Sequence, residues 1–205
     1  AVGALAVSRS SVGVVRVFAG GPSGLSTTPQ REIQRPRGHW SFGSSVAGAG
    51  DVNGDGYADL AVGAPDVRPD ERALSGSVSV FGGSADGVVE APLRVIEGAV
   101  GASGFGRSLA WIRDVDGDGC AELAVGVSIP ASGAQGAAMA AQVFHGDPSG
   151  VAATPRRVIT EPIVGDPRGG PLVGPGDVNG DGFADLCVTF ARSNGVYRVT
   201  RTGVF

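Results

Sequence analysis

The sequence repeats itself every 63 residues, and this period constrains the fold more than any other feature of the chain. Three acidic segments mark the repeat: DVNGDGYAD from Asp51, DVDGDGCAE from Asp114 and DVNGDGFAD from Asp177. Phenylalanines that end strand-like runs keep the same spacing, at Phe18, Phe81 and Phe144. A fixed period is typical of proteins that stack one supersecondary unit several times. We therefore expect a repeat fold.

Each unit is expected to form four short strands. In the best-preserved unit the pattern predicts strands around residues 42–48, 60–65, 76–81 and 93–96. The chain contains 36 Gly and 13 Pro in 205 residues, together with many Val, and this composition favours strands and tight turns over helices. Runs that are apolar on both faces suit sheets packed between other sheets. The sequence therefore predicts an all-β fold, a β-propeller of four-stranded antiparallel blades.

Counting the expected strands gives about 3.5 blades, which is a single partial or half propeller. An incomplete blade is expected over residues 1–37, with strands near 5–7, 13–18 and 32–34. Complete blades are expected over residues 38–99 and 100–163, and a second incomplete blade over 164–205. Because an open stack leaves apolar sheet faces uncovered, we expect a second copy or sequence of a longer parent chain to complete the ring, in preference to closure of this chain alone into a strained four-blade ring.

The acidic segments have the ligand pattern of a loop that holds a hard cation. Oxygen-bearing side chains fall at positions 1, 3, 5 and 9, and glycine at position 6 permits a sharp turn around one point. Calcium takes roughly six to eight oxygen ligands, and the backbone carbonyl of position 7 would add one more to each set. We predict three Ca²⁺ sites, with the ligands Asp51, Asn53, Asp55, Tyr57 and Asp59; Asp114, Asp116, Asp118, Cys120 and Glu122; and Asp177, Asn179, Asp181, Phe183 and Asp185.

Two other interpretations of these loops fit the sequence less well. An EF-hand loop opens in the same way but requires Glu at position 12, where this chain has Val62, Val125 and Val188. Asp, Asn and Gly also form turns without any metal, but three loops with three or four carboxylates each favour a bound cation, because like charges repel. Glu122 replaces the Asp of the other two loops, which predicts a shifted geometry at the middle site.

Three elements in one order resemble the FG-GAP repeat of the integrin α-chain β-propeller and its bacterial relatives. They are Phe42-Gly43, the acidic loop and Gly63-Ala64-Pro65. The next unit keeps Phe105-Gly106 and its loop but has Gly126-Val127-Ser128 in place of the triplet, and the last unit keeps only the loop. The resemblance implies loops between the first and second strands of a blade, and an extracellular or cell-surface location. It also implies a protein or glycan ligand bound on the opposite face, near residues 66–75 and 128–138.

No catalytic arrangement is recognisable, so we predict that the chain is not an enzyme and has no catalytic residues. His39 and His145 lack metal-ligand spacing and are expected to be turn or rim residues. The net charge of -4 and the dispersed arginines argue against nucleic-acid binding, and no apolar run approaches the roughly 20 residues of a membrane span. The sequence thus predicts a calcium-binding propeller module of a secreted or cell-surface protein that serves adhesion or ligand binding. The alternatives are a non-catalytic accessory propeller of a secreted glycan- or lipid-active enzyme, and a lectin-like glycan binder.

Overall fold

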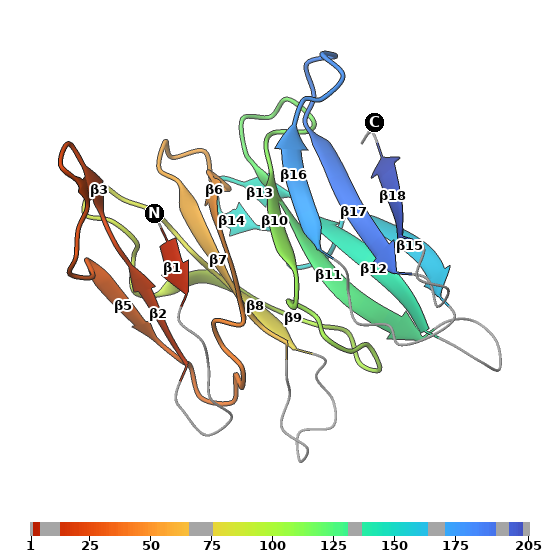
Figure 1. The fold of residues 1–205 in the computed structure, drawn as a ribbon, viewed down its shortest axis with the longest axis horizontal. Helices are drawn as coiled ribbons and strands as arrows, with labels where there is room; N and C mark the ends of the chain where they lie inside the picture. The colour runs from red at the N-terminus through yellow and green to blue at the C-terminus, as the bar shows by residue number, and fades with distance from the viewer. Residues whose placement is uncertain are drawn as a thin grey trace.

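A computed structural model describes residues 2–4, 13–65, 76–130, 137–163, 171–191 and 197–202. These residues form four main antiparallel sheets and contain no helix (Figure 1). Helices long and apolar enough to cross a membrane are likewise absent from this part of the chain. The first sheet contains β1 (Val2–Ala4), β2 (Val14–Val17) and β5 (Arg31–Gln34). The second contains β6 (Ser45–Gly50), β7 (Asp59–Ala64), β8 (Ser77–Phe81) and β9 (Pro92–Glu97).

The remaining strands repeat this plan. The third sheet contains β10 (Leu109–Ile112), β11 (Glu122–Pro130), β12 (Ala137–Phe144) and β15 (Arg157–Ile163). The fourth contains β16 (Leu172–Gly176), β17 (Asp185–Ala191) and β18 (Tyr197–Thr202). Two short hairpins follow the third strand of their units: β3 (Gly20–Gly21) with β4 (Gly24–Leu25), and β13 (Gly146–Asp147) with β14 (Gly150–Val151). The sequence analysis did not predict these hairpins.

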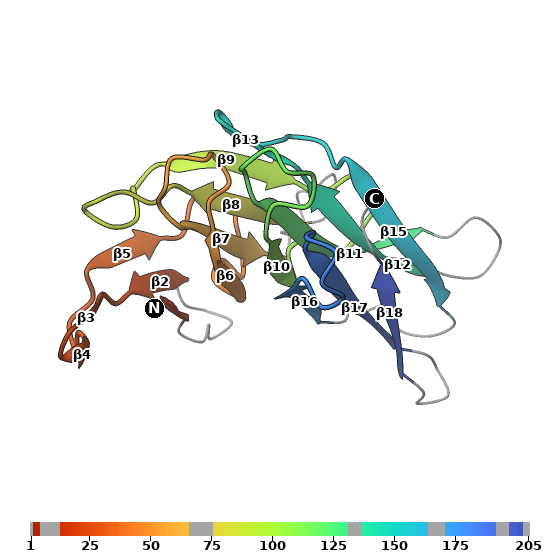
Figure 2. The same ribbon diagram turned by 90° about the horizontal axis from the view of Figure 1, so that it is seen from above.

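The four sheets lie side by side in an open row and do not close on one another (Figures 1 and 2). The first and fourth sheets are at opposite ends of this row. Among the first strands, β10 contacts both of its neighbours, β6 and β16, as the innermost strands of propeller blades do. The prediction of an all-β fold with about 3.5 propeller blades is confirmed, because the sheets contain three, four, four and three strands. The strand expected near residues 5–7 lies outside the described residues.

The hydrophobic core lies between the sheets, in three separate layers. One of these layers joins residues of the second sheet, such as Val78 and Val80, to Leu123 and Val125 of the third. Strand β7 is buried along its whole length, as expected for a strand covered on both faces. Each blade therefore depends on its neighbours for most of its apolar burial.

The Phe-Gly and Gly-Ala-Pro motifs meet at the junction between neighbouring blades. Phe105 is buried and packs edge-to-face on Phe144, with ring centroids 6.0 Å apart. Gly106 adopts a φ of 85°, which side chains disfavour. A Cβ added to Gly63 would lie 2.0 Å from the carbonyl oxygen of Gly106, so the triplet glycine of one blade allows the Phe-Gly turn of the next to approach closely.

Candidate cation-binding loops

The three acidic loops occupy equivalent places in three successive sheets. They connect β6 to β7, β10 to β11 and β16 to β17, and Figure 1 shows all three along the same edge of the row, at the top of that view. We call them the first loop (residues 51–59), the middle loop (114–122) and the last loop (177–185). In each loop the acid at position 9 is also the first residue of the following strand.

The aspartate at position 1 organises the loop through the backbone. In the last loop, Asp177 Oδ1 accepts the N–H of Gly180 at 2.6 Å, and Oδ2 accepts that of Gly182 at 2.9 Å. The Gly182 N–H is the strongest of several contacts that lower the pKa of Asp177. In the middle loop, burial acts to raise the pKa of Asp114, but backbone donors led by Gly119 outweigh it and lower that pKa. Asp114 and Asp177 are therefore held as carboxylates.

Positions 3 and 5 are linked to each other in the first and last loops. The side-chain amide of Asn53 donates to Asp55 Oδ2 at 2.9 Å, and that of Asn179 donates to Asp181 Oδ2 at 2.7 Å. Position 7 differs among the loops, because the Tyr57 and Phe183 side chains are exposed whereas Cys120 is buried. Such variation is expected at a position whose side chain has no ligand role.

The acids at position 9 are buried at the base of each loop. Asp59, Glu122 and Asp185 are each 2 % exposed. One carboxylate oxygen of each accepts the backbone N–H of position 2, at 2.8, 2.9 and 2.9 Å respectively. The second oxygen of Asp59 accepts the N–H of Gly83 at 2.8 Å. Burial is the main reason why the pKa of Asp59 is raised, and the two N–H donors act against it.

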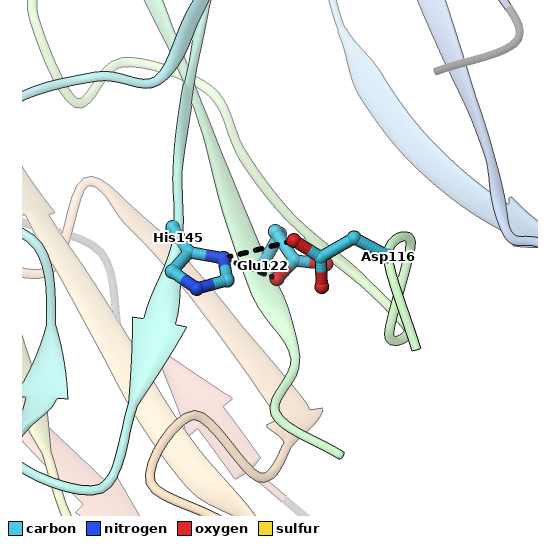
Figure 3. Close-up of side chains that lie close together, drawn as sticks. All are labelled: Asp116, Glu122 and His145. Atoms are coloured by element: carbon cyan, nitrogen blue, oxygen red, sulfur yellow. Dashed lines mark ion pairs between the residues drawn. The ribbon is translucent and has the colours of Figure 1, made fainter. Parts of the chain in front are cut away.

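The middle loop differs from the other two around Glu122. Its Oε1 is buried and has no hydrogen-bond partner, and it lies 3.3 Å from Nδ1 of His145 (Figure 3). Burial raises the pKa of Glu122 to about 7. Asp116 Oδ2 lies 3.6 Å from the same imidazole nitrogen and also contacts the guanidinium of Arg156.

The chemistry of these residues fits a divalent cation. In the middle loop, one oxygen each from Asp114, Asp116 and Asp118 lies within 4.8 Å of the others. Two unit charges about 4 Å apart repel by about 1 kcal/mol in water and by more near a protein surface, so a cation among these oxygens would relieve a real cost. Oxygen-rich loops of this kind suit Ca²⁺, which would hold the loop together by charge and supply no reactive group.

Two residues of this site escaped the sequence analysis. His145 follows a strand end, as expected of a turn residue, but its ring reaches the middle loop. Arg156 reaches the same loop from the segment before β15. One signal in the sequence could have revealed the histidine. It directly follows Phe144, a landmark of the repeat, at a place where the preceding unit has Gly82.

Two of the repeats in this chain match a known repeat family, and the chain is similar to known proteins. The FG-GAP repeat model matches residues 42–81 and 105–138. The chain is 48 % identical over 89 residues to integrin alpha pat-2 of Caenorhabditis elegans. This match covers 42 % of this chain and 7 % of that protein. It is 38 % identical over 122 residues to integrin alpha-PS5 of Drosophila melanogaster and 36 % identical over 119 residues to integrin alpha-5 of Xenopus laevis. Each of these two matches covers 56 % of this chain but only 11 % of the relative.

Proposed function

We propose that this chain is a propeller module of an extracellular or cell-surface protein that serves adhesion or ligand binding, because the FG-GAP repeat model matches two of its repeats and the chain is similar to integrin α-chains. The observation that carries this proposal is the occurrence of three acidic loops in equivalent places along one edge of a row of blades (Figure 1). That edge would be a cation-stabilised scaffold, and recognition would use other loops. A module of this kind needs no catalytic residue.

Structural Ca²⁺ in the acidic loops is part of the proposal. The ligands would be the side-chain oxygens at positions 1, 3, 5 and 9, with the carbonyls of Tyr57, Cys120 and Phe183. Support comes from the charged state of position 1 and from the acidic cluster of the middle loop. The expected ligand-binding segment over residues 66–75 lies outside the described residues, as does most of the turn within 128–138.

A binding survey tests the adhesive function. Fluorescently labelled chain is applied to a panel of coated extracellular-matrix proteins and to a glycan array, each in millimolar Ca²⁺ and in chelator. We expect saturable binding to at least one protein, reduced in chelator because the blades lose their cations. Binding confined to glycans would instead support the lectin-like alternative. An accessory propeller of a secreted enzyme would be supported by a catalytic domain elsewhere in the parent protein.

We also propose that the blades span residues 1–37, 38–99, 100–163 and 164–205, and that a second copy or further parent sequence completes the ring. The burial of residues that occupy the same place in successive sheets supports the need for a further blade. Ala61 and Ala124 are completely buried beneath the following sheet, whereas Cys187, which occupies the same place in the fourth sheet, is only half-buried. Val173, in the first strand of that sheet, is 54 % exposed.

These uncovered faces predict that the isolated chain self-associates. Light scattering coupled to size-exclusion chromatography is expected to give a mass of at least twice the 20.3 kDa of one chain. A discrete dimer would indicate that two copies complete the ring, and larger aggregates would indicate that parent sequence normally covers the open ends. A monodisperse monomer at all concentrations would contradict the proposed closure.

A further inference from the structure

The middle loop carries a group of ligand atoms that the other loops lack. Imidazole Nδ1 of His145, a carboxylate oxygen of Asp116 and Oε1 of Glu122 converge from the turn after β12, from the loop and from the start of β11 (Figure 3). We infer that these three residues form a site for a divalent transition-metal ion such as Zn²⁺, which would compete with the Ca²⁺ proposed for the middle loop because both ions would use Asp116 and Glu122. The inference rests on the proposed function only in treating the acidic loops as cation sites.

The spacing of the three ligand atoms suits a small ion. His145 Nδ1 lies 3.3 Å from Glu122 Oε1 and 3.6 Å from Asp116 Oδ2. Zinc bonds to nitrogen and oxygen measure about 2.0 to 2.2 Å, which places the ligand atoms of a tetrahedral site roughly 3.3 to 3.6 Å apart. Both distances from His145 Nδ1 therefore match such a site, and the two carboxylate oxygens lie within 4.8 Å of each other.

The buried carboxylate oxygen gives an independent reason to expect a ligand here. Glu122 is 2 % exposed, and its Oε1 has no hydrogen-bond partner. The equivalent oxygen of Asp59 in the first loop accepts the N–H of Gly83. Buried polar atoms in native proteins nearly always have a partner, and an orphaned oxygen next to an imidazole nitrogen is accounted for by an ion that binds both.

The surroundings of His145 are compatible with the tautomer that binds metal. Its Nε2 lies 3.1 Å from Asp118 Oδ2, so a proton on Nε2 has an acceptor. Nδ1 then presents a lone pair to the cluster, and the Arg156 guanidinium, which can only donate, lies 3.4 Å from it. A ligating histidine commonly donates its other ring N–H to a carboxylate, which fixes the ring. Asp118 is thus a positioning residue for His145.

Space for an ion is present at the same place. Asp116, Glu122, His145 and Arg156 line a cavity of about 50 Å³, and about 10 to 15 Å³ is enough to hold one water molecule. Arg156 pairs with Asp116, and its side chain is 59 % exposed, so it can move into solvent when the ion enters. Calcium prefers oxygen ligands alone, whereas imidazole with carboxylates suits zinc and its neighbours in the first transition series.

Zinc binding to the full chain tests the inference. Both cysteines are free thiols, so measurements use the wild type and a Cys120→Ser/Cys187→Ala background, which removes thiol ligands. Equilibrium dialysis against Zn²⁺ in excess Ca²⁺ is expected to give one zinc per chain, and Co²⁺ should give an absorption spectrum of mixed nitrogen and oxygen ligation. His145→Gln is expected to weaken zinc binding at least about tenfold, and Asp118→Asn roughly tenfold. His39→Gln changes the other histidine and should bind zinc as tightly as the same chain without this substitution.

A second variant keeps the test decisive if His145→Gln fails to fold, as judged by circular dichroism. Arg156→Gln removes the competing cation and is expected to tighten zinc binding.

The inference is overturned if the starting chain binds no zinc at micromolar concentration. It is also overturned if His145→Gln binds zinc as tightly as the starting chain, or if Arg156→Gln binds zinc no more tightly than the starting chain. Calcium titrations of the same variants separate this result from the proposed function. Loss of calcium binding with zinc binding intact would refute only the calcium loops, and the reverse outcome would refute only the zinc site.

Discussion

Removal of divalent cations is expected to lower the melting temperature of this chain by roughly 10 °C. If each loop binds calcium with a Kd of about 0.1 to 1 mM, as extracellular modules do, calcium at ten times that Kd stabilises the fold by about 1.4 kcal/mol per site. Two or three filled loops then contribute about 3 to 4 kcal/mol. A domain of this size loses about 2 to 4 °C for each kcal/mol, which gives the expected shift.

The measurement compares thermal melts in chelator and in 10 mM Ca²⁺. Asp177→Asn removes a carboxylate that would bind calcium in the last loop and should abolish about a third to a half of the calcium response. Asp86→Asn makes the same change of charge at an exposed position outside the loops and should leave the whole response intact. Identical melting temperatures with and without chelator would show that the acidic loops are turns without a structural ion.

The repeat made most of the fold predictable from the sequence, because a fixed period shows which residues must be structurally equivalent. Phe42 and Phe105 were matched by spacing alone, and each packs edge-to-face on a phenylalanine at the end of the third strand of its own sheet. The apolar run of β7 likewise predicted a strand covered on both faces, and every residue in it is buried. The hairpins β3–β4 and β13–β14 were missed, because two-residue strands have too little pattern to recognise.

The candidate site was predictable only where its residues are adjacent in sequence. Each acidic loop contains its own oxygen-bearing side chains, so the three loops could be recognised from nine residues each. His145 is 23 residues after Glu122, and Arg156 is further along still. Only the pairing of β11 with β12, which sets Leu123 opposite Phe144, brings the histidine to the middle loop. A contact that depends on strand register requires the structure. The only local sign of it in the sequence was His145 itself, which stands where the preceding unit has Gly82.

Replacing Phe105 by alanine is expected to destabilise the fold by about 3 to 5 kcal/mol, close to the whole contribution of the cations. The ring is 1 % exposed and lies in the apolar layer between the second and third sheets, against Phe144. Its removal would leave a cavity at a junction of two blades, and neither sheet can close it without moving the Gly106 turn that packs against Gly63. The midpoint of thermal or urea unfolding measures the loss.

Two further variants show whether burial between blades is the cause of this effect. Phe105→Leu keeps most of the buried volume and should cost clearly less than Phe105→Ala. Phe183→Ala removes an aromatic ring that is 49 % exposed at position 7 of the last loop, where only the backbone has a proposed role, and should stay within about 0.5 kcal/mol of the wild type. If Phe105→Ala were as mild as Phe183→Ala, the Phe-Gly motif would not hold neighbouring blades together. Because each blade buries its apolar residues against the next, a large loss confined to Phe105→Ala would instead show that this junction contributes much of the stability of the row of sheets.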